Sequence, residues 1–441
     1  MFLSRPGLNP EDYANSRYLT LTSNPVTDEA RSFGRFLAKQ VFAAPKRTSR
    51  RGRPPNTEAR DAVLLQIVAD MLEASSRGER LWVFRSLNAN GFRSDGISYR
   101  HFRSCAEALV SGGYAEHRPG FHYRSPLEFG QSGRNPNLAA SRWRPAKLLI
   151  DMCGKFDIEP ANAKTHFSWK LPEQVVVLKA PSVRSGSHKV KGRQVRFQQT
   201  DRSTLFSDQV KEINKYLLDH EIANGVHRGF RRIFNDVSDI SSYGWNRGGR
   251  IYGIGMDNYQ LQPKDVRRLI TIDGKPTTEI DIKASHLTIL HALAGVQLPA
   301  PDPYAVPGLP REVVKSWFLI AFGAGHYPTR WSKEAYLELK RNASGAEWLK
   351  KYRARAVTEI CKAHYAEVIA YWETSGLDSL DFQFLESEAV IDAMLTLKRK
   401  HDVPSLPVHD SIIIAEEARD LAIEVLSQSY KLKFGAAPLL A

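Results

Sequence analysis

Residues 269–282 read LITIDGKPTTEIDI, and this stretch decides the fold expected for the C-terminal part of the chain. The Asp-Gly pair at 273–274 is a strong hairpin signal between two alternating segments. In the second segment Ile280 and Ile282 face one way, and Asp281 faces the other. The stretch therefore predicts a β-hairpin that presents one carboxylate at a strand end, on the open face of a sheet.

A second carboxylate lies in residues 405–415, which read SLPVHDSIIIA. Two short apolar strands flank His409, Asp410 and Ser411 at a tight turn. If these strands neighbour the first hairpin, Asp410 and Asp281 converge and can hold two Mg²⁺ ions ~4 Å apart. Mg²⁺ suits such a site because it takes few protein carboxylates and completes its shell with phosphate and water. Strand-end aspartates are common, however, and two unrelated surface residues would give the same pattern.

Three motifs in order resemble those of the family A DNA polymerases, the DNA polymerase I family. Residues 279–295, EIDIKASHLTILHALAG, resemble motif A, and residues 407–414, PVHDSIII, resemble motif C. Residues 311–323, REVVKSWFLIAFG, resemble motif B of the fingers. The phage-type single-subunit RNA polymerases share the His-Asp-Ser turn. The resemblance covers about 245–441 and implies a right-hand polymerase palm and fingers.

The resemblance implies roles for individual residues in a two-metal nucleotidyl transfer. Asp281 and Asp410 would bind two Mg²⁺ ions, for which Mn²⁺ is the possible substitute, with the backbone carbonyl of Ile282 as a further ligand. Arg311 and Lys315 would neutralise the nucleoside triphosphate, and Lys315 would also protonate the leaving pyrophosphate. Solvated surface charges remain the other interpretation of this Arg-Lys pair.

The remaining implied site residues contact the nucleotide or the nucleic acid. Phe322 and His286 would shape the nucleotide pocket, Arg250 and Arg268 would contact template or primer phosphates, and His409 would pack near the primer end. A core aromatic and a structural histidine are the alternatives for Phe322 and His409.

Two of these positions depart from the family pattern. His286 stands where the DNA polymerases usually have glutamate and the RNA polymerases glycine, and Phe322 replaces a tyrosine. Bulky side chains here would exclude a ribose 2′-hydroxyl, so deoxynucleotides are expected.

The front of the chain is basic. Of the net charge of +14, residues 1–150 carry +10, which favours a polyanionic partner such as DNA. Residues 1–56 read as an extension that ends in a basic linker. Arg51 and Arg53 of its RGRP sequence resemble an AT-hook, which binds the narrow minor groove of DNA. A flexible linker is the alternative.

Residues 57–125 predict a winged helix-turn-helix DNA-binding domain. We expect a first helix from residue 57, a second at 81–87 that stops at Gly91, and a third capped by Ser98. Arg100 and Arg103 lie near the start of the third helix, where a recognition helix meets the major groove. A β-wing would turn at residues 119–120. A helical domain that binds protein, or binds nothing, is the alternative.

Residues 126–244 form a connecting, thumb-like region in this prediction. Residues 141–156 suggest one helix, 173–180 a strand and 206–218 an amphipathic helix. Between them residues 181–199, PSVRSGSHKVKGRQVRFQQ, read as a basic loop that is either disordered or closes over nucleic acid.

Composition excludes several classes of protein. No apolar run approaches the ~20 residues of a membrane span, so no membrane partner is expected. No secretion signal opens the sequence, and the three cysteines lie far apart, which suits a reducing cytoplasm.

Together these features predict an α+β polymerase, palm and fingers at 245–441, behind an α-rich winged-helix domain. The expected enzyme is a DNA-directed DNA polymerase without a proofreading exonuclease, acting on DNA template and primer with nucleoside triphosphates, in replication of a phage or other mobile element. An RNA polymerase or primase is the first alternative. A non-catalytic DNA-binding replication regulator is the second.

Overall fold

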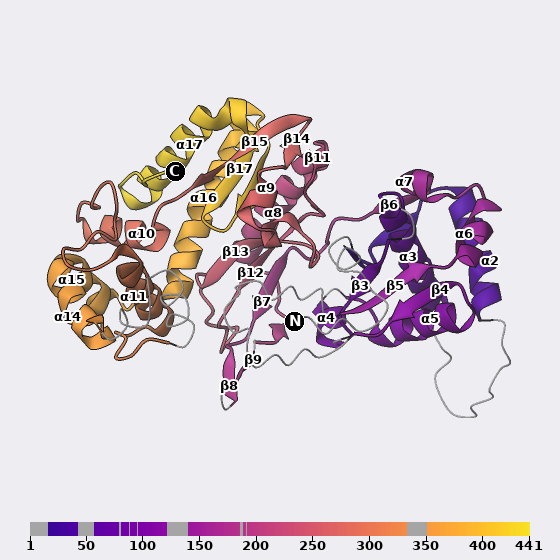
Figure 1. Ribbon diagram of the computed structural model, residues 1–441, viewed down its shortest axis with the longest axis horizontal. Coiled ribbons are helices and arrows are strands. Elements are labelled where there is room, and N and C mark those ends of the chain that lie inside the picture. Colours follow the sequence, from indigo (N-terminus) through magenta and orange to yellow (C-terminus); the bar gives the residue numbers. More distant parts are fainter. Residues whose placement is uncertain are drawn as a thin grey trace. The chain divides into compact units, whose positions relative to one another are not determined.

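The structure is a computed structural model that describes residues 16–42, 57–78, 81–87, 89–94, 96–120, 140–185, 188–190, 192–332 and 351–441. The chain divides into two compact units, each with its own hydrophobic core (Figure 1). Unit 1 comprises residues 1–124, 133–171 and 255–257. Unit 2 comprises residues 125–132, 172–254 and 258–441.

Unit 1 is built around one long helix, α3 (Thr57–Ser75), whose apolar side chains are almost all buried. Helices α2 (Asp28–Val41) and α5 (Tyr99–Ser111) pack against it. Its remaining helices are α4 (Ala89–Ser94), α6 (Lys147–Gly154) and α7 (Ala163–His166). The main sheet has the order β1-β3-β5-β4, from β1 (Arg17–Tyr18), β3 (Val83–Arg85), β5 (Ser141–Pro145) and β4 (Ala115–Arg118). A separate pair joins β2 (Ser23–Pro25) to β6 (Phe167–Trp169).

The third helix predicted within residues 57–125 is confirmed. The helices predicted at 81–87 and at 141–156 are wrong. Ser98 caps α5 through its hydroxyl, which accepts from the backbone N–H of His101, and Gly112 ends the helix. Residues 81–87 hold strand β3 instead of a helix, and Gly91 lies inside α4. The single helix expected at 141–156 is a strand followed by a helix, because Pro145 disfavours helical geometry in the residue before it.

Unit 2 contains two sheets and a free ribbon. One sheet has the order β10-β7-β12-β13, from β10 (Gln194–Val195), β7 (Val176–Lys179), β12 (Phe230–Phe234) and β13 (Gly248–Gly253). The other is wholly antiparallel, with the order β11-β14-β15-β17-β16, from β11 (Ile222–Ala223), β14 (Thr271–Ile272), β15 (Lys275–Asp281), β17 (Ser411–Ala415) and β16 (Ser405–Val408). The ribbon pairs β8 (Val183–Ser185) with β9 (His188–Val190).

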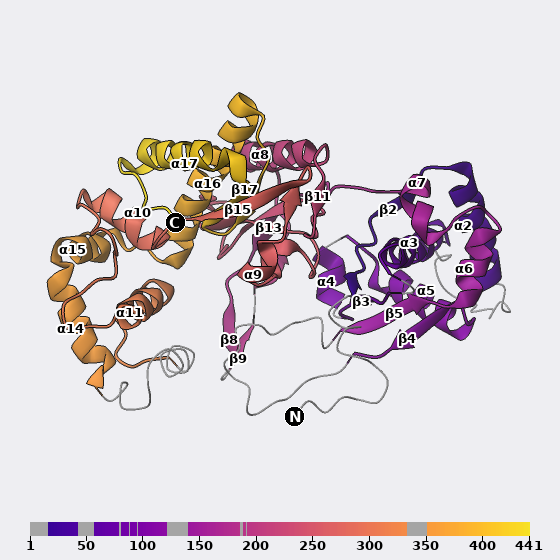
Figure 2. The ribbon, with the colours of Figure 1, turned by 45° about the horizontal axis from the view of Figure 1, so that its top comes forward.

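The helices of unit 2 form two groups. Helices α8 (Asp201–Leu217), α16 (Ser379–His401) and α17 (Arg419–Phe434) pack against the strands and lie along one side of the sheets (Figure 2). Helices α11 (Arg311–Ala324), α14 (Ala354–His364) and α15 (Ala366–Ser375) form a separate group. Helix α10 (Ser285–Ala294) contacts both α15 and α16, and α9 (Lys264–Arg267) is a single turn.

The predicted α+β class is confirmed at this level, and so is the hairpin of residues 269–282. Residues 248–253 form strand β13, which has a bulge opposite Ile233 and Phe234. Within the described residues, no helix is long and apolar enough to cross a membrane.

Candidate active site

Two neighbouring strands bring Asp281 and Asp410 together. Strands β15 and β17 are antiparallel, and their register places Asp281 opposite Ser411. The backbone N–H of Ile282 donates to the carbonyl of Asp410 over 3.1 Å. Asp410 follows His409 in the turn from β16 to β17, and His409 adopts the left-handed conformation (φ 55°) that this turn requires. The sequence predicts that Asp281 and Asp410 converge if their strands are neighbours. Strands β15 and β17 are neighbours, so the fold brings the two aspartates together.

The two carboxylates lie in an environment that disfavours their charge. Burial raises the pKa of Asp281, and the negative charge of Asp410 adds to the effect. Burial, followed by the charge of Glu386, raises the pKa of Asp410 to about 6. Within the described part of the chain neither carboxylate forms an ion pair, although the charge of Lys264, and to a smaller extent that of Lys315, opposes the rise in the pKa of Asp281. Such a carboxylate pair is electrostatically suited to a cation.

Sequence reasoning missed Glu386, which is completely buried below this pair. Its Oε1 accepts from the guanidinium of Arg250, at 2.8 Å from Nε and 2.6 Å from Nη2. Its Oε2 has no hydrogen-bond partner among the described residues. Burial raises the pKa of Glu386. Glu386 lies on the same face of α16 as the buried Val390 and Leu397, so a carboxylate on an apolar helical face was the available signal.

His286 lies beside this buried ion pair. Its ring stacks on Phe382 with 5.4 Å between ring centroids, and its Nε2 is 3.6 Å from Glu386 Oε2. Burial, with the charge of Arg250, lowers the pKa of His286 to about 3, so the imidazole is neutral and adds no positive charge. Arg250, which is predicted to contact nucleic-acid phosphates, forms an ion pair with Glu386 of its own unit.

Helix α11 presents the predicted Arg-Lys pair one turn apart. Lys315 is half-buried and close enough to Asp281 to lower the pKa of that carboxyl. Arg311 instead donates from Nε to Asp302 over 3.1 Å and from Nη1 to Glu312 over 2.9 Å. Phe322 is buried 4.7 Å from the ring of Phe382, so the structure places it in the core.

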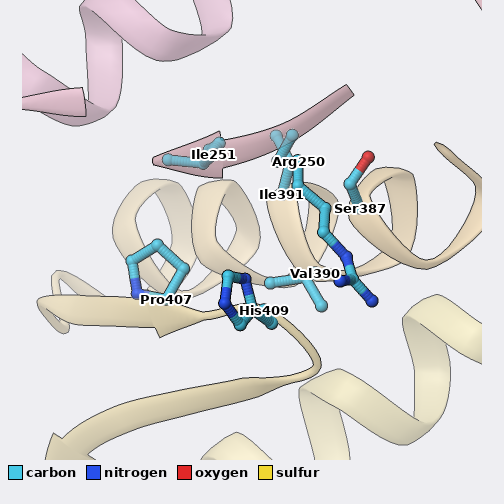
Figure 3. A pocket seen from close by; sticks show the side chains of 7 residues that line it. All are labelled: Arg250, Ile251, Ser387, Val390, Ile391, Pro407 and His409. Atoms are coloured by element: carbon cyan, nitrogen blue, oxygen red, sulfur yellow. The ribbon is translucent and has the colours of Figure 1, made fainter. Parts of the chain in front are cut away.

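His409 and Arg250 line a small pocket beside the β16–β17 turn (Figure 3). Its other walls come from β13, α16 and β16, through Ile251, Ser387, Val390, Ile391 and Pro407. Although His409 is partly exposed, its loss of solvation against the protein, with the charge of Arg250, lowers the pKa of His409 to about 4, so this imidazole is neutral as well. Arg268 does not line this pocket; it lies exposed where α9 ends.

The structure describes two of the four arginines that are predicted to contact DNA in unit 1. Arg100 and Arg103 are both exposed on α5, and Arg103 forms an ion pair with Glu107 over 2.7 Å. Arg51 and Arg53, and with them the AT-hook-like sequence, lie outside the described residues.

The donor set at Asp281 and Asp410 fits Mg²⁺ better than a metal that needs a full protein cage. Among the described residues, no three histidine, cysteine, aspartate or glutamate side chains group as a ligand set. Two carboxylates and a backbone carbonyl leave positions that phosphate oxygens and water can fill, which is how Mg²⁺ is usually held.

Comparison with known proteins finds a structural likeness and no match of another kind. No protein-family model matches the chain, and no curated protein matches it. Among solved structures, the chain is similar to the POL domain of Pol1 from M. smegmatis, in complex with DNA primer-template and dNTP. The match has 12% sequence identity and a TM-score of 0.28, and covers 54% of this chain and 51% of the other, about half of its length.

Proposed function

We propose that unit 2 is the palm and fingers of a template-directed DNA polymerase that resembles family A and lacks a proofreading exonuclease. The observation that carries the proposal is the pairing of β15 with β17, which converges two half-buried carboxylates without a cationic partner among the described residues. The two-stranded turn between β16 and β17 and the adjoining helix α11 supply the other parts of such a site.

In this proposal Asp281, Asp410 and the carbonyl of Ile282 would hold two Mg²⁺ ions, which would supply activation of a primer 3′-hydroxyl and neutralisation of charge at the α-phosphate. Lys315 binds the triphosphate, since it already lies within electrostatic reach of Asp281. Arg311 joins it after exchanging the carboxylate of Asp302 for a phosphate, a stronger bidentate acceptor.

Deoxynucleotides are the proposed substrates. His286 is held in one orientation by stacking on Phe382, and Phe322 packs behind it with 6.4 Å between ring centroids. A rigid aromatic wall of this kind leaves little room for a 2′-hydroxyl.

For unit 1 we propose a winged-helix domain that binds DNA. Its support is the element order α3, β3, α4, α5, β4, β5, with β5 paired between β3 and β4. In this arrangement α5 is the recognition helix, and its exposed Arg100 is the first candidate for a base or phosphate contact.

Primer extension tests the catalytic proposal. Wild type should extend a primed DNA template with dNTPs in Mg²⁺ or Mn²⁺, and Asp281→Ala and Asp410→Ala should abolish extension while DNA binding is retained. Asp420→Ala is the matched control, because Asp420 is fully exposed on α17. Synthesis from NTPs alone, on primed or unprimed templates, would favour the RNA polymerase or primase. Absence of synthesis under every template, metal and nucleotide condition would favour a DNA-binding regulator.

A further inference from the structure

A basic β-ribbon leaves the sheet of unit 2 between β7 and β10. These two strands pair with each other, and the chain between them continues as β8 and β9 beyond the end of the sheet (Figures 1 and 2). Residues 178–200 of this segment contain six Lys or Arg and no Asp or Glu. The candidate active site uses none of them.

The base of the ribbon has a defined geometry. The backbone N–H of Ala180 donates to the carbonyl of Arg193 over 2.9 Å, which continues the β7–β10 pairing. A Cβ atom at Gly192 would lie 1.6 Å from the carbonyl oxygen of Ala180, so only glycine permits this close crossing of the two strands. The ribbon is therefore anchored to the sheet rather than attached by an open loop.

Two arginines and two valines of the ribbon are exposed. Arg193 and Arg196 are exposed, and within the described residues neither side chain forms a hydrogen bond or an ion pair. Val183 and Val190 are directly opposite each other in the register, and 64% and 55% of their surfaces are exposed. The two valines form a small exposed apolar pair on one face of the ribbon.

We propose that this ribbon, through strands β8 and β9 and the exposed Arg193 and Arg196, binds duplex DNA in the major groove. The inference rests on the nucleic-acid partner of the proposed function, but not on catalysis. The major groove of B-form DNA admits a two-stranded β-ribbon and displays thymine methyl groups, which suit the valine pair. The arginines neutralise phosphates at the groove edges. The deep, narrow major groove of an RNA duplex does not admit such a ribbon.

Fluorescence anisotropy of the full chain on a labelled DNA duplex tests the proposal, with EDTA present and nucleotides absent. Each phosphate contact contributes about 0.9 to the slope of log K against log salt. Arg193→Gln/Arg196→Gln should therefore make the slope shallower by about 1.8 and weaken binding about tenfold or more in 100 mM KCl. Lys431→Gln/Lys433→Gln removes the same charge from an exposed part of α17 and should leave the slope unchanged.

A second variant separates the apolar contact from the charge. Val183→Ser/Val190→Ser should weaken binding to the DNA duplex severalfold while the salt slope stays the same. Unchanged slope and affinity in the arginine variant would overturn the proposal, and so would equal losses on single-stranded DNA or on an RNA duplex. If wild type synthesises nothing but the ribbon variants lose duplex affinity as described, the polymerase proposal fails and the ribbon assignment stands.

Discussion

Replacing Asp410 with asparagine should stabilise the metal-free protein. In the folded state burial and the charge of Glu386 raise the pKa of Asp410 to about 6, from an ordinary value of 3.8. A carboxyl with a raised folded-state pKa weakens folding once pH exceeds its unfolded pKa, because the folded environment then has to hold the charged form. Asparagine keeps the size and hydrogen-bonding shape of the side chain and removes that charge.

The magnitude follows from the size of the shift. A rise of about two pKa units at 1.36 kcal/mol per unit corresponds to ~3 kcal/mol at pH 7 and above, of which partial exposure removes some. We expect Asp410→Asn to raise the free energy of unfolding by about 2 kcal/mol in EDTA at pH 7.5, which is ~5 °C in Tm for a domain of this size. The difference should grow as pH rises from about 4 to 6, and should vanish below pH 4.

Scanning calorimetry at pH 3.8, 5 and 7.5 measures this difference directly. Asp420→Asn serves as the control, because its side chain is fully exposed on α17 and should change Tm by less than 1 °C. Added Mg²⁺ should stabilise wild type and not Asp410→Asn, which reverses the order of the two proteins. An Asp410→Asn protein that is no more stable than wild type in EDTA at pH 7.5 would refute the electrostatic reasoning for the site.

Three further predictions follow from single contacts. Glu386→Ala leaves the guanidinium of Arg250 without its buried carboxylate and should lower the free energy of unfolding by ~3–5 kcal/mol in urea denaturation; a loss below 1 kcal/mol would mean that the pair is solvated. Ser98→Ala removes the cap of α5 and should cost about 1 kcal/mol in thermal unfolding of unit 1, where an unchanged Tm would contradict the cap. Lys315→Met should raise the KM for dNTP about tenfold or more in primer extension, with partial recovery in Lys315→Arg, and an unaltered KM would remove Lys315 from the triphosphate site.

The parts of the fold that the sequence predicted well are those governed by local chemistry. The Asp-Gly turn at 273–274 defines the hairpin, and the hydroxyl of Ser98 defines where α5 begins. Strand β3 was predicted as a helix because three consecutive buried residues fit either structure when periodicity alone is used. At Pro145 the choice between strand and helix was not ambiguous, because proline disfavours helical geometry in the residue before it. The prediction of one helix over 141–156 did not use this signal, and the structure has β5 followed by α6.

The candidate site was predictable where residues are close in the sequence and not where they are distant. Asp281 and Asp410 were each recognised from their own strand ends. Glu386 was not, because its partner Arg250 lies on β13, and only tertiary packing joins the two. For the same reason Arg250 was expected to face nucleic-acid phosphates, although a carboxylate of α16 already occupies its guanidinium.

The pairing of β15 with β17 also determines when this sheet can form during translation. Strand β15 ends at Asp281, and its partner β17 begins at Ser411. The ribosome therefore makes β17 about 130 residues after β15. Translation adds roughly 5–20 residues per second, so one edge of β15 stays unpaired for on the order of 10 s. During this time the neighbour of β15 in the sheet is the two-residue strand β14. During that interval the nascent chain carries an open strand edge that favours pairing with other chains, so its yield in a cell should depend on translation speed and on chaperones that cover unpaired strands.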